Sequence, residues 1–498
     1  MKIQQLQRMA LLCAFAFASA CGGGDAETGG GTAKGDSAAA PGADSAKTEA
    51  AAPAVKSPRD QAPAIIRGLY LNAYKAGSGA QRKRFIEIAD QTEINAFVID
   101  VKDERGVHYR SQLELPMQLT PPSEITLRDL KGIADTLQAH GIWTIARIVV
   151  FKDPVLSKAR PEWSVQRPGG GLWVDKAGNT WVSTWDERVW DYNIKIAEEV
   201  AKLGFDEIQF DYIRFAEPYK SLPPQVHPRA RGDRADAIAA FLNEAKRRLH
   251  PLGVTVTADV FGLSPNEAGD VNIGQQWETV SAIADGVLPM MYPSHYFPTH
   301  LPGVSRPDLQ PYDVLFKSAG MARWRSDQMQ AVGVRPARIV PWLQAFSAPW
   351  LGRNHQKYGP EQIRQQKQGV YDVGLEDWVL WHPGSNYEQF VPALERGEAQ
   401  SRKKAQYTPP ADVMSWLNRF EREGVRAARE EAARQARGDV NDPAAAAAAR
   451  TGRPDPSTPP SKTTPGTNAP AEAAPKGPAA TPAAGGQTNP SNPAQNRP

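Results

Sequence analysis

The sequence predicts an α/β fold, a closed (β/α)8 TIM barrel over residues 62–400, with a disordered tail at each end. Eight short runs rich in β-branched and aromatic residues alternate with segments of helical periodicity. The alternating region has the length expected of one barrel. Both flanks have compositions that cannot bury an apolar core.

Each of the first seven runs predicted to be strands is followed by a longer segment in which apolar residues recur at helical spacing. In chain order, the strands are expected at 66–71, 96–101, 143–150, 207–214, 254–260, 286–292, 339–345 and 378–381. The helices between them are expected at 81–91, 126–140, 187–203, 234–249, 277–283, 313–331 and 360–372. An open doubly wound sheet is the alternative. It would need a glycine-rich nucleotide loop after the first strand, and residues 70–73 supply none.

The first 20 residues resemble a bacterial lipoprotein signal peptide. Lys2 and Arg8 form a charged start, an apolar segment too short to span a bilayer follows, and small residues precede Cys21. The resemblance implies that residues 1–20 are removed and that Cys21 is lipidated. We therefore expect an exported protein anchored to the cell envelope, and Gly22 favours the outer membrane. An ordinary secretory signal is the alternative.

The remaining cysteine and the flanking segments limit what the mature chain contains. Cys13 lies inside the signal, so we expect no disulfide and no cysteine-based site. Residues 21–61 are predicted to be a flexible linker, 401–437 a charged helical extension, and 438–498 a disordered tail rich in Pro and Ala. The net charge of +3 and the lack of a long Lys/Arg run argue against nucleic acid as a partner.

Polar and aromatic residues are concentrated at the carboxyl ends of the predicted strands, where barrel enzymes carry their reactive groups. The candidate catalytic residues are Asp211, Asp259 and Asp103. The candidate substrate-binding residues are Asn72, Tyr74, Asp100, Arg147, Gln209, Arg214, Tyr292, Gln344 and Trp381. The barrel has no HxH or HExxH pattern, and we expect neither a cofactor nor a metal.

Two carboxyl groups at the ends of adjacent strands suit the cleavage of a glycosidic bond, which needs one on either side of the scissile bond. Asp211 is the candidate nucleophile or base, and Asp259 is the candidate general acid. Asp103 or Glu104 is the alternative acid.

A carboxylate inside the apolar run that contains Asp211 is costly unless it is paired or catalytic. Arg147 and Arg214 are the expected partners, because a nearby cation favours the charged form. The alternative is a buried Asp–Arg pair that only fixes the barrel register.

The segment 151–186 is long for a loop between a strand and a helix, and it contains Trp163, Trp173, Trp181 and Trp185. Indole rings stack well on the C–H faces of sugars, so we interpret this loop as one wall of a carbohydrate site. The alternative is a small tryptophan-rich core that pins the loop.

Six segments resemble a family of bacterial barrel proteins described as putative glycoside hydrolases and long catalogued as a domain of unknown function. They are RGLYLNAY (67–74), FVIDVKDERG (97–106), IARIVVFKDP (145–154), GFDEIQFDYIRF (204–215), TADVFG (257–262) and PMMYPSHY (289–296). The fourth is the most specific, although Ala216 follows it where members often have Pro. The resemblance covers essentially the whole predicted barrel. It implies a TIM-type barrel and a carbohydrate substrate.

These observations predict a glycoside hydrolase that cleaves a polysaccharide or oligosaccharide by paired-carboxylate catalysis, held at a membrane by its lipid anchor. The first alternative is a non-catalytic carbohydrate-binding lipoprotein on a degenerate barrel, which would keep the aromatic residues but have only one competent carboxylate. A metal-dependent hydrolase or deacetylase is the second alternative, and the scattered histidines disfavour it.

Overall fold

The strands form one sheet that closes on itself, because β1 pairs with both β2 and β10. The structure is a computed structural model and describes residues 57–396 and 407–409. All pairings are parallel except that of β3, which forms a short antiparallel pair with β2. The strands are β1 (Arg67–Leu71), β2 (Ala96–Asp103), β3 (Gly106–Val107), β4 (Trp143–Val149), β5 (Glu207–Asp211), β6 (Thr255–Phe261), β7 (Gly286–Met290), β8 (Arg338–Ile339), β9 (Trp342–Gln344) and β10 (Trp378–Trp381).

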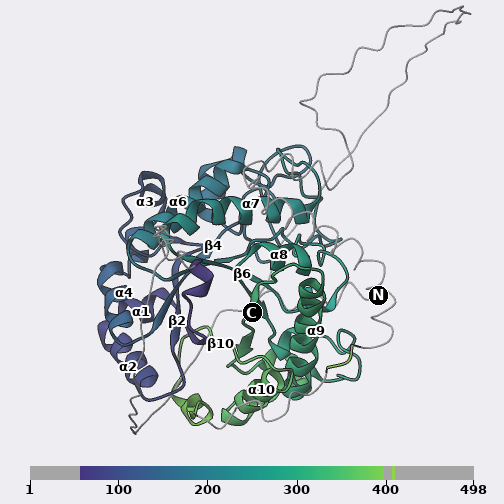
Figure 1. Cartoon of the computed structure of the whole chain (residues 1–498). Helices are drawn as coiled ribbons and strands as arrows, with labels where there is room; N and C mark the ends of the chain where they lie inside the picture. The colour runs from purple at the N-terminus through teal and green to yellow at the C-terminus, as the bar shows by residue number, and fades with distance from the viewer. Residues whose placement is uncertain (1–56, 397–406, 410–498) are drawn as a thin grey trace, which may run out of the picture. The chain divides into compact units, whose positions relative to one another are not determined.

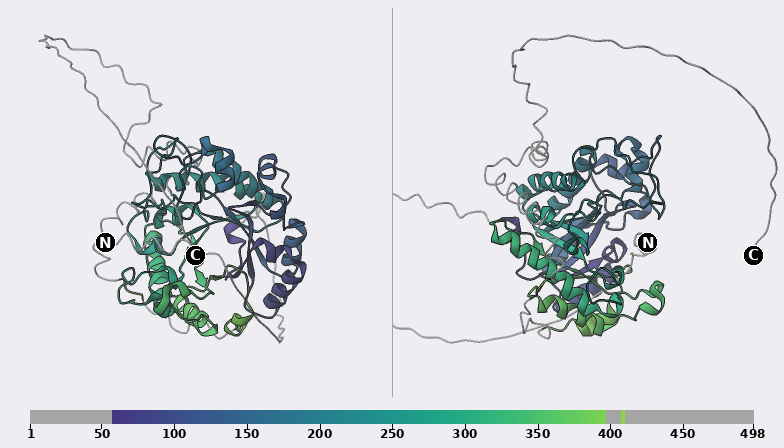
Figure 2. Two further views of the ribbon diagram at one scale, coloured as in Figure 1. Left: turned by 180° about the vertical axis from the view of Figure 1, so that it is seen from behind. Right: turned by 90° about the vertical axis from the view of Figure 1, so that its right-hand side faces the viewer.

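The helices lie around the outside of this sheet, with α1, α2 and α4 on one side and α9 and α10 on the other (Figure 1). The α-helices are α1 (Ala73–Gly77), α2 (Gly79–Asp90), α3 (Glu114–Leu119), α4 (Leu130–Ala139), α5 (Pro154–Ala159), α6 (Glu187–Lys202), α7 (Arg234–Leu249), α8 (Trp277–Ile283), α9 (Pro311–Ala331) and α10 (Pro360–Asp372). The 3-10 helices are η2 (Pro58–Asp60), η3 (Pro122–Glu124), η4 (Pro161–Trp163), η5 (His250–Leu252), η6 (Ser264–Asn266), η7 (Pro293–His295), η8 (Pro307–Leu309), η9 (Pro349–Asn354) and η10 (Glu388–Ala393). The views of Figure 2 show the same arrangement from behind and from the side.

The predicted (β/α)8 barrel is therefore confirmed, and the helices expected at 277–283 and 360–372 have the bounds observed for α8 and α10. Two strands differ most from expectation. The seventh is divided into β8 and β9. The fourth ends at Asp211 rather than at residue 214, because Tyr212 adopts a left-handed backbone with φ of 51° that cannot continue a strand.

Two apolar layers hold the barrel together. The outer layer lies between the sheet and the helices, as where Phe210 of β5 meets Phe241 of α7 with ring centroids 5.1 Å apart. The inner layer fills the barrel with side chains that include Tyr70, Val98, Ile145, Leu288, Trp342, Val379 and Trp381. The interior is thus a packed core.

Several predicted features lie outside the described residues: the signal peptide 1–20, Cys21, the linker up to residue 56, most of the extension 401–437, and the tail 438–498. The last residues of the predicted linker do belong to the described fold, since the Pro58 carbonyl accepts a 3.2 Å hydrogen bond from Thr255 Oγ1. Tyr407, from the predicted extension, packs edge-on against Phe316 of α9. No helix within the described part of the chain is long and apolar enough to cross a membrane.

Candidate active site

Strand β5 turns three polar side chains into the barrel. Glu207, Gln209 and Asp211 alternate with the apolar residues Ile208 and Phe210, because successive side chains of a strand point to opposite faces. The three polar residues are all buried. Asp211 ends the strand and so lies at the carboxyl end of the barrel, where barrel enzymes carry their reactive groups.

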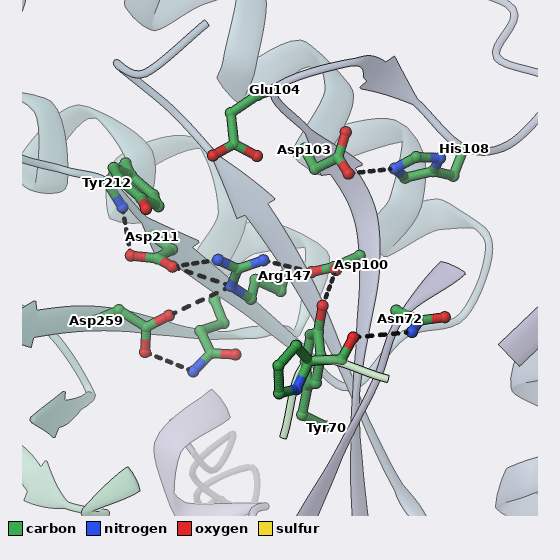
Figure 3. A network of polar contacts seen from close by, with 12 residues as sticks. Tyr70, Asn72, Asp100, Asp103, Glu104, His108, Arg147, Asp211, Tyr212 and Asp259 are labelled. Carbon is green, nitrogen blue, oxygen red and sulfur yellow. Dashed lines mark hydrogen bonds and ion pairs between the residues drawn. The ribbon is translucent and has the colours of Figure 1, made fainter. Parts of the chain in front are cut away.

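Arg147 of β4 joins carboxylates from three other strands (Figure 3). Its Nε donates to Asp211 Oδ2 at 3.0 Å, and its Nη2 donates to the same oxygen. Its Nη1 donates to Asp100 Oδ1 at 2.5 Å, and its Nε lies 3.8 Å from Asp259 Oδ2. Burial alone would lower the pKa of Arg147, but the charges of Asp100 and Asp211 hold this pKa well above its ordinary value. The guanidinium is therefore a permanent cation at the centre of the network.

Asp100 of β2 supports Arg147 from the side opposite Asp211. Its Oδ2 accepts a hydrogen bond from the Tyr70 hydroxyl, while its Oδ1 accepts from Arg147. Burial raises the pKa of Asp100, and the charge of Arg147 opposes this rise only in part. Both of its oxygens are occupied, so Asp100 is placed to position Arg147.

Asp259 of β6 is the most deeply buried carboxylate of the network. Its Oδ1 accepts hydrogen bonds from Gln209 Nε2 at 2.8 Å and from Trp342 Nε1 at 2.7 Å. Burial, followed by the negative charge of Asp211, raises the pKa of Asp259 well above its ordinary value, although Arg147 acts in the opposite direction. Asp259 thus keeps its proton to a higher pH than an ordinary carboxyl group, as a general acid requires.

Tyr212 follows Asp211 in a strained conformation. Its left-handed backbone is uncommon for a residue with a side chain and costs about 1 kcal/mol or more. The Tyr212 N–H donates to Asp211 Oδ1 at 2.5 Å. The Tyr212 ring packs edge-on against the Trp181 ring, with centroids 5.9 Å apart. The Lys152 ammonium lies 4.7 Å from the centroid of the Tyr212 ring. These contacts hold the strained turn and, through it, the second oxygen of Asp211.

Asp103 lies apart from the network that Arg147 forms. A register shift between Asp100 and Lys102 accompanies the turn into β3, and Asp103 faces His108 and Arg105. Its Oδ2 is 3.2 Å from His108 Nε2 and 2.5 Å from Arg105 Nη2. Burial opposes ionisation, but these two partners hold the pKa of Asp103 well below its usual range. A group this acidic is poorly suited to donate a proton at neutral pH.

Glu104, the other alternative acid, is the most accessible carboxylate near the network. It lies above Asp211 and Arg147 in Figure 3. Its side chain is 31% exposed, and its Oε1 is 2.7 Å from Lys152 Nζ. In contrast, the side chain of Asp259 is 1% exposed. Access to a substrate therefore favours Glu104 as the acid, whereas protonation favours Asp259.

Arg214, the second predicted partner of Asp211, pairs elsewhere. Its Nη1 lies 3.1 Å from Glu217 Oε2 and donates to the Phe215 carbonyl. Its guanidinium lies 4.9 Å from the ring of Trp181 and 4.6 Å from that of Phe261. The left-handed turn at Tyr212 leads the chain out of the sheet, so Arg214 holds the following loop.

Aromatic side chains occupy the other half of the barrel mouth. Tyr292, which follows β7, stacks on Trp381 of β10 with ring centroids 5.3 Å apart and planes 27° apart. Phe346 meets the same indole edge-on at 5.6 Å, and Tyr70 lies 6.1 Å from it. The ring of Tyr70 also lies 5.8 Å from the Arg147 guanidinium, so it joins the aromatic half to the carboxylates.

The remaining predicted binding residues have structural contacts. Asn72 caps α1 through its side chain. Tyr74 is 46% exposed and donates to Glu124 at 2.9 Å. Gln344 is buried, and its amide group donates to Asp308 at 3.0 Å. These three residues therefore lie outside the network around Arg147.

The tryptophans of the segment 151–186 form a small core rather than an open wall. Trp173, Trp181 and Trp185 are exposed by only 1%, 2% and 5%. Trp173 Nε1 donates to the Pro223 carbonyl, and Trp181 Nε1 donates to Asp175. The wall interpretation is wrong for these three residues, because their rings pack under the loop and leave no face for a sugar.

Tyr70 and Trp342 were not among the predicted site residues, yet both touch the carboxylates. Both lie in apolar runs that any buried strand could contain. The strand order shows that Tyr70 of β1 faces Asp100 of the neighbouring β2 and that Trp342 of β9 reaches Asp259 of β6, two strands away. Alternation along β1 and β9 is the signal that could have placed these side chains inside the barrel.

The histidines needed by the metal-dependent alternative are not grouped in the described part of the chain. No three His, Cys, Asp or Glu side chains within residues 57–396 and 407–409 are placed to hold a metal ion. Burial lowers the pKa of His295 and of His300 to about 4.

Comparisons with known proteins agree with this geometry at the level of the family. Residues 68–387 match a family described as a putative glycosyl hydrolase domain. No curated protein matches the sequence.

Three solved structures illustrate the range of similar proteins. A hypothetical protein from Ruminiclostridium thermocellum is 36% identical over 39% of this chain and 97% of that chain, with a TM-score of 0.35. The glycoside hydrolase domain of PgaB (BpsB) from Bordetella bronchiseptica is 15% identical over 64% and 94%, with a TM-score of 0.44. A chitinase from Chromobacterium violaceum is 14% identical over 68% and 100%, with a TM-score of 0.38.

Proposed function

Because this chain belongs to the family of the glycosyl hydrolase domain that its residues 68–387 match, we propose that it is a glycoside hydrolase that cleaves a polysaccharide with Asp211 and Asp259. One observation carries the proposal. A single guanidinium, that of Arg147, contacts two carboxyl groups from adjacent strands at the carboxyl end of the barrel. Glycosidic cleavage uses such a pair, one charged and one protonated.

Each carboxyl group has its own role in this mechanism. Asp211 attacks the anomeric carbon or removes a proton from the attacking water, with its oxygens oriented by Arg147 and by the Tyr212 N–H. Asp259 donates its proton to the oxygen of the leaving sugar. Asp100 is a positioning residue that holds Arg147. Trp381, which is 9% exposed and on which Tyr292 stacks, offers the accessible aromatic surface for a sugar ring beside the reacting bond.

The first test is the release of reducing ends from a panel of bacterial polysaccharides by the full chain. We expect the wild type to release them from one class of glycan and the nearly isosteric Asp211→Asn variant to release none. Asp103→Asn is the matched control, since that carboxylate lies outside the network and its loss should leave turnover unchanged. Turnover by a folded Asp211→Asn variant would remove Asp211 from the mechanism.

The identity of the acid needs its own comparison. In this mechanism Asp259→Asn is more damaging than Glu104→Gln. The reverse order would assign the acid role to Glu104, whose greater exposure gives it easier access to a substrate.

We also propose that the enzyme is exported and held at the cell envelope by a lipid on Cys21. Support comes from the charged start, the short apolar segment and the small residues before this cysteine. Incorporation of labelled palmitate by the wild type, but not by Cys21→Ser, is the expected result. Equal labelling of both chains would contradict the anchor.

A further inference from the structure

Two segments beside the candidate site carry cations that no acidic group neutralises. Residues 164–182 and 216–231 contain five Lys and Arg but only two Asp and Glu. Arg167, Lys176, Lys220 and Arg229 form what we term the basic rim. Among the described residues, none of these four side chains is paired with a carboxylate.

The two acidic residues of these segments are already engaged. Asp175 accepts hydrogen bonds from Trp181 Nε1 at 2.9 Å and from two backbone N–H groups of its own turn. Glu217 pairs with Arg214 at 3.1 Å. Arg167, Lys220 and Arg229 are exposed and Lys176 is half-buried, and no ion pair within the described part of the chain compensates their charges, an arrangement that suits an anionic ligand.

The structure brings the two segments that carry these cations side by side although they are distant in sequence. Gln166 and Val226 exchange two backbone hydrogen bonds of 2.9 Å, which places Arg167 and Arg229 on neighbouring segments. The Lys176 ammonium lies 4.3 Å from the ring of Tyr219, the residue before Lys220.

The two segments that carry the basic rim are joined to the candidate active site at Tyr212. The segment 216–231 follows the strained turn at Tyr212, one residue after Asp211. Trp181, at the end of the other segment, packs on the ring of Tyr212. Two exposed aliphatic side chains, Val174 and Val226, lie in the same two segments and offer apolar contact between the charges.

We infer that the basic rim binds an anionic glycan, so that the substrate carries carboxylate, sulfate or phosphate groups on sugars beside the one that is cleaved. This inference rests on the proposed hydrolase function, which it narrows to one class of polysaccharide. The interior carboxylates act on the glycosidic bond, whereas the rim holds the charged chain. Gly169 and Gly170 form an exposed tip with positive φ and open space where a side chain would lie, which lets the backbone lie close to a bulky polymer.

Binding of the full chain to dextran sulfate and to uncharged dextran tests the inference without any need for turnover. The two polymers have the same backbone and differ in charge. We expect binding to dextran sulfate alone, weakening as salt rises because exposed charges are screened. The variant Arg167→Gln/Lys220→Gln/Arg229→Gln should bind about tenfold more weakly, since each exposed ion pair contributes modestly.

A matched variant separates a local site from overall charge. Lys83→Gln/Lys131→Gln/Lys202→Gln removes the same charge from the outer helices α2, α4 and α6 and should bind as the wild type does. Equal weakening of both variants, equal binding of the two polymers, or binding of neither polymer would overturn the inference. Binding to phosphatidylglycerol vesicles but not to dextran sulfate would also overturn it and assign the rim to a lipid surface.

The outcome is distinguishable from that of the hydrolase proposal. If the chain binds dextran sulfate through the rim but releases no reducing ends from any glycan, the anion-binding inference stands and the hydrolase proposal fails. If the chain hydrolyses a neutral glycan and the rim variant is equally active, the hydrolase proposal stands and the inference about the rim fails.

Discussion

The two halves of the barrel mouth differ in what they bury. Strands β2, β4, β5 and β6 bury three carboxyl groups around one guanidinium. The opposite half, from β7 and β10, buries stacked aromatic rings. The two halves meet at Tyr70, which touches both Asp100 and the Trp381 ring.

This difference shows where the fold gives up stability. Aromatic rings in a packed interior stabilise it through buried apolar area. Buried charges must instead offset their lost hydration, and a well-packed apolar replacement is often as stable or more so. Three carboxyl groups around one cation are therefore difficult to explain by stability, and catalysis gives a reason for them.

Loss of the central cation should have the largest effect on stability. Arg147→Met removes the only partner that neutralises Asp100 and Asp211 within the described network. We expect the free energy of unfolding to fall by about 3–5 kcal/mol, because buried carboxylates are left unpaired. Urea denaturation measures this change. Lys131→Met, which breaks an exposed pair, should cost less than about 1 kcal/mol. Similar small losses of stability in both variants would contradict the claim that Arg147 neutralises these buried carboxylates.

Loss of the Asp259 proton donor should have the next largest effect, and the effect should depend on pH. We expect Asp259→Asn to lower kcat by about a hundredfold, the usual contribution of a general acid. In the wild type, activity should fall at alkaline pH as Asp259 loses its proton, because its pKa is raised. A kcat that is the same in both chains across the pH range would remove Asp259 from the mechanism.

The raised pKa of Asp259 also predicts how the stability of the folded chain depends on pH. This pKa is higher in the folded than in the unfolded chain, so folding is favoured by this carboxyl group at low pH. That contribution is fully present below the unfolded pKa and is lost as pH rises through the folded pKa. Asn cannot ionise, so the stability of Asp259→Asn relative to the wild type should rise with pH. Parallel stability curves for the two chains would show that Asp259 does not titrate in this way.

A substitution among the aromatic residues of β7 and β10 should have the smallest effect on activity, and it should change KM rather than kcat. Trp381→Phe keeps an aromatic ring but reduces its area, so we expect KM to rise about threefold with kcat nearly unchanged. Trp378 is the matched control, because it lies on the same strand but bonds to Tyr371 outside the barrel. Trp378→Phe should lower stability without changing KM. A lower kcat in Trp381→Phe would place this ring in the chemical step.

Much of the fold could be predicted from sequence, because strand and helix patterns in a (β/α)8 barrel are local. The bounds of α8 and α10 follow from their helical periodicity. The division of the seventh strand into β8 and β9 and the early end of β5 could not be predicted. The early end of β5 depends on a single backbone conformation, the left-handed turn at Tyr212.

The candidate site could be predicted only where the position of a residue along its strand was enough to place its side chain. Asp211, Asp259 and Arg147 were expected together because they lie toward the carboxyl ends of neighbouring parallel strands, and the structure places them in contact. The placement of Asp103 and Arg214 could not be predicted. A register shift turns the first toward His108, and the turn at Tyr212 carries the second to Glu217.

The most direct test of the central claim is azide rescue of Asp211→Ala on the polysaccharide that the reducing-end screen identifies. This variant leaves a space and an unpaired Arg147 cation where the carboxylate was, and the small azide anion fits both. The account predicts that turnover falls by about a thousandfold and that azide restores part of it by attacking the anomeric carbon, with a glycosyl azide as the product. Wild-type turnover by a folded Asp211→Ala chain, with no glycosyl azide formed, would contradict it.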